Sequence, residues 1–117
     1  MSLPAPLTPE TAQSIADRFR LLGEPTRLRI LYLLCDGERS VGTLAEALDC
    51  TQANVSKHLT LMTDAGVLRR RRDGVHSYYA VADTSVYGLC ERVCDCLRDY
   101  WDARAGALPR PGATSAG

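Results

Sequence analysis

The stretch SVGTLAEALDCTQANVSKHLTLMTDAGVL, residues 40–68, contains two short amphipathic segments joined by a tight turn. Ser40 and Thr51 each precede one of these segments, and both residue types are preferred as helix N-caps. The apolar side chains recur at helical spacing on one face of each segment, as Val41, Leu44, Ala45 and Leu48 and then as Val55, Leu59 and Met62. Two short helices joined by a tight turn form a helix-turn-helix unit.

Two further helices are predicted before this unit. Thr8 is followed by Pro9, the order of an N-cap and a first helical residue, and Gly23 can end the helix that they begin. Pro25 opens the next helix, which closes near residues 36–37 and is apolar around much of its circumference. We expect this second helix to be buried on more than one side.

The period of the sequence changes after the unit. In LRRRRDGVHSYYAVA, residues 68–82, two extended runs flank Asp73-Gly74, which predicts a β-hairpin with a type I′ turn. A last helix is expected from about Thr84 to Arg104. Its apolar set is Val86, Leu89, Cys90, Val93, Cys94, Leu97, Tyr100 and Trp101. The expected fold class is therefore mainly α with a small β-hairpin.

Length and composition indicate one globular domain. The 117 residues are 45% hydrophobic, and 14 basic side chains balance 14 acidic ones. Residues 1–7 and 105–117 are rich in small residues and proline, so we expect a flexible N-terminus, a domain over 8–104 and a disordered tail. The start MSLPAPLTPE has no basic and apolar leader, and no run is long enough for a membrane span. We expect a cytoplasmic protein without a membrane partner.

Charge is distributed unevenly along the chain. Residues 51–80 hold five basic side chains against two acidic ones, together with both histidines. Residues 83–104 instead hold five acidic side chains against three basic ones. The first of these sections is the candidate for binding nucleic acid.

The fourth predicted helix and the hairpin supply the candidate DNA contacts. Opposite Val55, the helix carries small, polar or basic side chains that suit a major groove: Gln52, Asn54, Ser56, Lys57 and Thr60. The alternative is an ordinary solvated face. The hairpin adds Arg69, Arg70, Arg71, Arg72 and His76, which can hold the DNA backbone, whereas the alternative is a charged edge that prevents aggregation.

Three stretches in order resemble the ArsR/SmtB family of winged helix-turn-helix repressors: LGEPTRLRILYLL, SVGTLAEALDCTQANVSKHLTLMTDAGVL and RRRRDGVHSYYAV. The similarity runs from about Phe19 to Leu97, and its VSKHL core, following glycine and arginine-rich wing make it specific. The resemblance implies a homodimer built on the first and last helices. It also implies binding to a double-stranded DNA operator and release by a metal, a metalloid or a thiol-reactive signal.

The sensing sites of the family can be compared with these residues. The Cys-Val-Cys arsenic site on the third helix is excluded, because Ser40-Val41-Gly42 stands there. The zinc site of the last helices would use Asp83, Ser85, Cys96 and Asp99. Serine is a poor zinc ligand, so this alternative metal site is weakened.

The stretch CERVCDCL, residues 90–97, is the remaining candidate. Cys90 and Cys94 lie on one helix face, whereas Cys96 lies about 200° away from Cys94 on an intact helix. Trivalent arsenic or antimony, the favoured inducers, would need a third thiolate from an unwound Cys96, from Cys35 or from the partner chain. Cadmium, lead and zinc are further options, and no organic cofactor is expected.

Other interpretations of the cysteines stay open. Cys90 and Cys94 occupy apolar positions of the helix, where cysteine is often simply buried. Cys35 is expected in the core and Cys50 as a small apolar plug of the turn. In a redox or reactive-sulfur (persulfide) sensor, Cys35 would instead bridge to Cys90 or Cys94.

A rival from another class is a thiol protein that buffers metals or serves as a redox partner without binding DNA. An enzyme is not expected, since the sequence has no Cys-x-x-Cys pair, no phosphate loop and no evident carboxylate pair.

Overall fold

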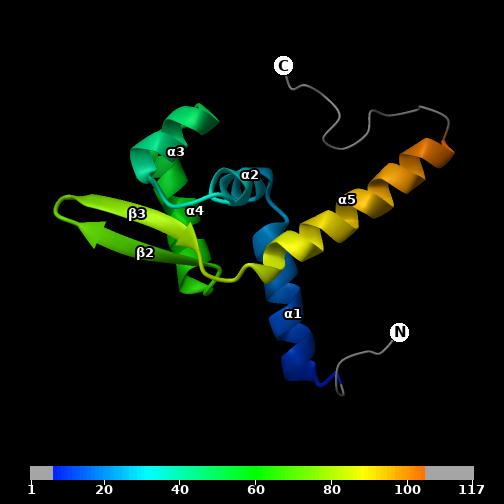
Figure 1. Cartoon of the computed structure of the whole chain (residues 1–117). Helices are drawn as coiled ribbons and strands as arrows, with labels where there is room; N and C mark the ends of the chain where they lie inside the picture. The colour runs from blue at the N-terminus through cyan, green and yellow to red at the C-terminus, as the bar shows by residue number, and fades with distance from the viewer. Residues whose placement is uncertain (1–6, 105–117) are drawn as a thin grey trace. The chain divides into compact units, whose positions relative to one another are not determined.

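The computed structural model of the chain describes residues 7–104. The predicted flexible N-terminus, residues 1–7, lies outside the described residues except for Leu7, and the predicted disordered tail, residues 105–117, lies wholly outside them. Contacts divide the chain into two compact units, up to Asp83 and from Thr84 onward. The elements in chain order are α1 (Pro9–Leu22), α2 (Pro25–Leu33), β1 (Arg39–Ser40), α3 (Val41–Leu48), α4 (Gln52–Asp64), β2 (Leu68–Asp73), β3 (His76–Val81) and α5 (Ser85–Ala103) (Figure 1).

Local signals start and end the first two helices. Thr8 Oγ1 accepts a hydrogen bond from the Thr11 amide at 3.1 Å, so the predicted N-cap of α1 is confirmed. Gly23 follows α1, and a Cβ there would lie 3.1 Å from the Phe19 carbonyl oxygen. The cap of α2 is Glu24, whose Oε1 accepts from the Thr26 amide at 2.7 Å. Carboxylates stabilise a helix N-terminus because they complement its exposed amides and dipole.

The helix-turn-helix unit forms as the sequence predicts. Ser40 and Thr51 cap α3 and α4 through hydrogen bonds of 3.2 and 3.1 Å from the amides of Thr43 and Asn54. Asp49 turns the chain between the helices in the left-handed region, at φ 55°, which aspartate tolerates better than most residues. Most of the inward residues predicted from spacing are buried, namely Leu44, Ala45, Leu48, Val55, Leu59 and Met62. Val41, which was predicted with them, is only half-buried at the start of α3.

The sheet has three strands, in the order β1-β3-β2, and all pairs are antiparallel. The predicted hairpin is β2 and β3, and Figure 1 shows it projecting beyond α3 and α4. The two-residue strand β1 was not predicted. It pairs Arg39 with Tyr79 and Ser40 with Tyr78, and a strand this short carries no alternating pattern of its own.

The predicted type I′ turn at Asp73-Gly74 is wrong by one residue. Asp73 pairs with His76, so the central residues are Gly74 and Val75. Among them only Gly74 has a positive φ, at 64°. A two-residue loop with glycine first and a single positive φ has the pattern of a type II′ turn.

The first unit encloses one apolar core. Its fully buried side chains come from α2, α3, α4 and the start of the sheet: Ile30, Leu31, Leu44, Val55, Leu59, Met62 and Val67. α1 contributes Leu22 to this core but leaves Ile15 and Phe19 exposed.

The second unit is the helix α5. It runs unbroken over 19 residues and has a strongly amphipathic sequence, yet only Val86 is buried among its residues. Leu89, Val93, Leu97 and Tyr100 are exposed. Within residues 7–104, none of the helices has the length and apolar character needed to cross a membrane.

Candidate nucleic-acid interface

The outer surface of α4 carries the predicted contacts. Gln52, Asn54, Lys57 and Thr60 are exposed, and Ser56 is half-buried. Lys57 and Thr60 line a shallow hollow together with Ala53, Ser56 and Leu61. Asn54 is exposed at the start of the helix and does not line this hollow. The exposed Leu61, which was not among the predicted contacts, adds an apolar edge to the same surface.

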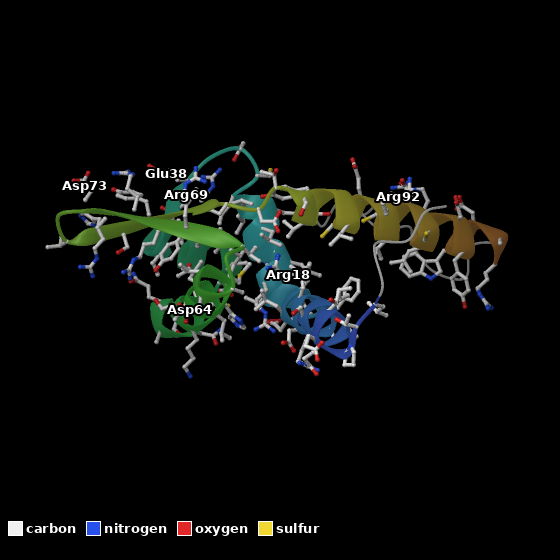
Figure 2. The ribbon with its side chains drawn as sticks, turned by 90° about the horizontal axis from the view of Figure 1, so that it is seen from below. Arg18, Glu38, Asp64, Arg69, Asp73 and Arg92 are labelled. Carbon is white, nitrogen blue, oxygen red and sulfur yellow. The ribbon has the colours of Figure 1, made fainter. Side chains whose placement is uncertain are left out.

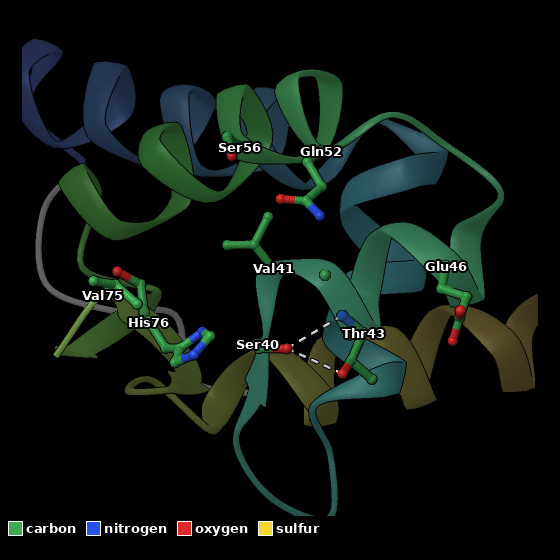
Figure 3. Close-up of a pocket in the computed structure, with 10 residues that line it drawn as sticks. Ser40, Val41, Thr43, Glu46, Gln52, Ser56, Val75 and His76 are labelled. Atoms are coloured by element: carbon green, nitrogen blue, oxygen red, sulfur yellow. Dashed lines mark hydrogen bonds between the residues drawn. The ribbon is translucent and has the colours of Figure 1, made fainter. Parts of the chain in front are cut away.

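A larger hollow of about 670 Å³ lies between the N-terminal ends of α3 and α4 and the tip of the hairpin. Gln52 and Ser56 line one side of it, and Val75 and His76 line another (Figure 3). Ser40, which holds the N-terminus of α3 through Thr43, lies at its floor. The structure therefore brings three predicted contacts, Gln52, Ser56 and His76, to one concave surface, with Val75 95% exposed at its rim.

The four consecutive arginines do not form one patch. Arg69 and Arg71 pair with Ala80 and Tyr78, whereas Arg70 and Arg72 pair with Tyr79 and Ser77. Because successive strand residues point to opposite faces, the two pairs of arginines lie on opposite sides of the sheet. The buried Tyr79 marks the side that packs on the helices. A hollow of about 440 Å³ there is lined by Arg70 and also by Arg69 of the same strand, together with Thr60 and Asp64 of α4.

Arg71 is engaged by acidic side chains. Its Nε and Nη2 donate to the Glu38 carboxylate at 3.1 and 2.6 Å, and its guanidinium lies 4.7 Å from the Tyr78 ring centre. Hydrogen bonding from Arg71 lowers the pKa of Glu38, and the same bond raises the pKa of Arg71. Figure 2 shows Glu38 and Arg69 on one side of the hairpin and Asp64 of α4 on the other.

Two polar networks position α4, and neither was predicted. Arg27 of α2 donates to the Leu21 carbonyl at 2.5 Å and contacts His58 Nδ1 at 3.2 Å. Since guanidinium only donates, Nδ1 accepts, and the ring proton sits on Nε2, 3.3 Å from Glu24 Oε2. The sequence places His58 at the edge of the apolar face of α4, where a bond to local backbone is the ordinary expectation. That expectation is wrong, since its ring contacts the side chains of Arg27 and Glu24. The sequence signal for the contacts of His58 with Arg27 and Glu24 was the position of a histidine beside the apolar face of an amphipathic helix.

The second network holds the other end of α4. Arg18 of α1 donates to the Ala65 carbonyl, which follows the helix, and to Asp83 Oδ2, both at 2.9 Å. A cation at a helix C-terminus satisfies unpaired carbonyls and complements the helix dipole. Asp83, predicted as an alternative metal ligand, thus already carries a cationic partner. Asp99, its predicted companion, is exposed on α5.

The candidate inducer site on α5 is simpler than its sequence suggests. Cys90 and Cys94 are half-buried, Cys96 is exposed, and all five cysteines are free thiols. Burial raises the pKa of the Cys90 thiol, and the neighbouring Cys94 raises it further. Among residues 7–104, no three histidine, cysteine or acidic side chains are grouped closely enough to hold a metal ion. A single chain in this conformation therefore offers at most the pair Cys90 and Cys94 to one soft ion.

The remaining cysteines differ in their surroundings. Cys35 was expected in the core but is exposed. The helix α2 ends at Leu33, so Cys35 lies in the turn that follows and not on a helix face. Cys50 is half-buried in the turn before α4, and its Sγ donates to the Leu48 carbonyl at 3.4 Å. That position fits the predicted role of a small plug.

Comparison with known proteins gives consistent matches. Residues 24–70 match the family described as "Bacterial regulatory protein, arsR family". The arsenical resistance operon repressor of Bacillus subtilis is 33% identical over 89 residues, which are 75% of this chain and 85% of the relative. The crystal structure of Rv0081 from Mycobacterium tuberculosis superimposes with a TM-score of 0.74 at 31% identity, covering 84% of this chain and 98% of that one.

A third match bears on assembly. The solution structure of the homodimeric winged helix-turn-helix DNA-binding domain of Mb0332 from Mycobacterium bovis has a TM-score of 0.69 and 28% identity. The match covers 81% of this chain and 91% of that domain. The winged helix-turn-helix architecture predicted from the sequence is thereby confirmed.

Proposed function

Because the chain belongs to the ArsR family of bacterial regulatory proteins, we propose that it is a homodimeric repressor that binds a double-stranded DNA operator and is released by a thiol-binding inducer. Family membership makes it a DNA-binding transcription regulator and not an enzyme. The observation that carries the proposal is the concave surface where Gln52 and Ser56 of α4 face His76 of the wing, the β2–β3 hairpin.

In this proposal α4 enters the major groove. Gln52 and Asn54 can each make paired hydrogen bonds to adenine, and Ser56 and Thr60 can reach bases or phosphates. Lys57 supplies positive charge on the same exposed surface. The basic wing, with His76 near its tip, follows the DNA backbone beside the groove.

Dimerisation through α1 and α5 is supported by apolar side chains that each helix leaves exposed. Phe19 of α1 is 58% exposed, and Val93 of α5 is 56% exposed. Soluble proteins seldom leave such a series of apolar residues on one helix face without a partner. The homodimeric assembly of the Mycobacterium bovis relative is consistent with the same use of this fold.

For the inducer we propose a soft ion bound by Cys90 and Cys94, with trivalent arsenic or antimony favoured and cadmium, lead or zinc as alternatives. The arsenical resistance repressor among the relatives supports the choice of arsenic. Two adjacent thiols on one face suit the first two bonds, and the third thiolate would come from Cys96, Cys35 or the second protomer. A site built on Asp83 and Asp99 is less favoured, because Asp83 would first have to leave Arg18.

A redox or reactive-sulfur repressor of the same fold is the second candidate. It is favoured by Cys35, which is a free and exposed thiol. An exposed thiol can be oxidised or persulfidated, whereas a buried one is protected.

The test measures fluorescence anisotropy of a labelled fragment of the protein's own promoter bound to the reduced protein. Arsenite, antimonite, cadmium, lead, zinc and a polysulfide donor are titrated against wild type, Cys90→Ser, Cys94→Ser and the matched control Cys50→Ser. We expect one agent to release wild type and Cys50→Ser but neither of the α5 variants. Release that survives both α5 substitutions refutes the assigned thiols, and absence of DNA binding by wild type refutes the repressor.

The rival thiol buffer makes the opposite prediction. A metal-buffering or redox-partner protein would keep its metal stoichiometry when all four wing arginines are replaced by glutamine, and it would have no operator to lose. A repressor should lose operator affinity and much of the salt dependence of binding.

A further inference from the structure

We propose that three of the four wing arginines divide into two kinds, with Arg70 and Arg72 contacting phosphates and Arg71 acting as a positioning residue that Glu38 holds away from the DNA. The inference rests on the proposed function and deepens it by assigning individual residues. It departs from the sequence-based expectation that all four arginines hold the backbone together.

The register of the hairpin places Arg70 and Arg72 on the opposite side of the sheet from Arg71. Arg70 and Arg72 lie on the side of the sheet that carries the buried Tyr79, toward α4. Arg70 lines a hollow together with Arg69, Asp64 and Thr60, and Thr60 is itself a predicted DNA contact. Charges on this side therefore continue the basic and polar surface of the helix that enters the major groove.

Arg71 is held by two carboxylates, those of Glu38 and Asp73. Two of its nitrogens donate to the Glu38 carboxylate in a fork, and Nη1 lies 3.9 Å from Asp73 Oδ2. Bidentate pairs of this kind fix geometry as well as charge. A guanidinium that faces two carboxylates brings no net positive charge to a phosphate, so Arg71 is poorly suited to displace counterions from DNA.

Glu38 lies on a segment that is fixed to the body of the domain. Glu38 precedes β1, a segment that Arg39 anchors by donating to the Leu33 carbonyl at 2.6 Å and to Asp36 at 3.2 Å. The β1 strand itself pairs only two residues with β3. The bond from Glu38 to Arg71 therefore attaches the outer strand β2 to the segment before β1, in addition to the packing of β2 on α4. It sets the direction in which the wing projects.

The two kinds of arginine differ in a measurable quantity. Each phosphate that a cationic side chain neutralises contributes about −0.9 to the slope of log K against log salt concentration. Replacing a phosphate-contacting arginine in both protomers should make the slope shallower by about 1.8. Replacing a positioning arginine should lower the affinity at every salt concentration and leave the slope unchanged.

The experiment compares Arg70→Gln, Arg71→Gln and Arg72→Gln, which remove the same charge from neighbouring positions of one strand. Operator affinity is measured by fluorescence anisotropy at salt concentrations from about 50 to about 300 mM, a range over which counterion release changes the affinity measurably. We expect shallower slopes for the variants at 70 and 72 and parallel, weaker binding for Arg71→Gln. A slope for Arg71→Gln as shallow as that of Arg72→Gln would overturn the assignment.

A charge swap separates positioning from loss of folding. Arg71→Glu places two carboxylates together and should weaken binding strongly, whereas the double variant Glu38→Arg with Arg71→Glu should recover most of the affinity. If the swap does not recover operator affinity, the positioning role is contradicted, because an ion pair between positions 38 and 71 would then not be sufficient to hold the wing.

Hydrogen exchange of the wing amides in the free protein tests the attachment without DNA. Exchange in β2 and β3 should accelerate in Arg71→Gln and Glu38→Gln but not in Arg72→Gln, and equal exchange in all variants would refute the attachment. Absence of DNA binding by wild type would refute the proposed function and the phosphate contacts, while the exchange experiment would still decide the role of Glu38.

Discussion

Val93 of α5 offers a direct test of the proposed dimer. In the single chain this side chain is 56% exposed, on the apolar face of an unbroken helix. Val93→Ala removes two methyl groups, each contributing about 0.8 kcal/mol when fully buried. If a partner covers the exposed half, the variant loses about 0.9 kcal/mol per protomer and about 1.8 kcal/mol per dimer.

A loss of about 1.8 kcal/mol weakens the dimer about 20-fold. Sedimentation equilibrium over a range of protein concentrations measures this change in the dissociation constant. Alanine favours helix in both the monomer and the dimer, so helix propensity should nearly cancel from the comparison.

Leu61→Ala serves as the matched control. Leu61 is also aliphatic and half-exposed, at 51%, but it lies on α4, outside the proposed interface. The reasoning is refuted if Val93→Ala leaves the dissociation constant unchanged, or if Leu61→Ala weakens the dimer to the same extent.

Three further predictions concern stability and reactivity. Arg18→Gln should lower the free energy of unfolding in urea by about 1 kcal/mol, because it removes the hydrogen bonds to Ala65 and Asp83. The control Arg20→Gln removes an exposed ion pair with Asp17 and should change this free energy little. Cys90 should be alkylated more slowly than the exposed Cys96 at neutral pH and should gain reactivity only at higher pH, as measured by peptide mass mapping. The reason is that burial raises the pKa of Cys90 and keeps its thiol protonated. For the same reason the stability linked to Cys90 is present below the unfolded pKa and is lost as pH rises through the folded one. Leu59→Ala should lower the free energy of unfolding by about 2–5 kcal/mol, since Leu59 is 0% exposed; a change below 1 kcal/mol, on the order of a surface substitution, would contradict its place in the core.

Much of the fold could be predicted because its signals are local. Ser40 and Thr51 each cap a helix through an amide three residues away, and the apolar positions of α3 and α4 repeat within single helical turns. The wing also followed from a glycine between two extended runs. Its turn was misplaced by one residue, because the pairing of Asp73 with His76 depends on the register of both strands.

The candidate site was predictable in part. The side chains proposed to face DNA were identified from the angular spacing of α4. In the structure four of them are exposed and Ser56 is half-buried. Their contacts with DNA remain predictions, as does the role of Cys90 and Cys94. The contacts of Arg27 and Arg18 that support α4 could not be predicted, since each joins residues that are distant along the chain.

The sequence by itself determined the order of the helices, the unit of α3 and α4, the wing and the likeness to a family of repressors. Caps, turns and apolar periods act over a few residues, so these features need no knowledge of the rest of the chain. Only the tertiary structure decided that Cys35 is exposed and that four consecutive arginines have different neighbours. Arg71 meets Glu38 across 33 residues of sequence, and such a contact exists only after packing and strand register bring the two segments together.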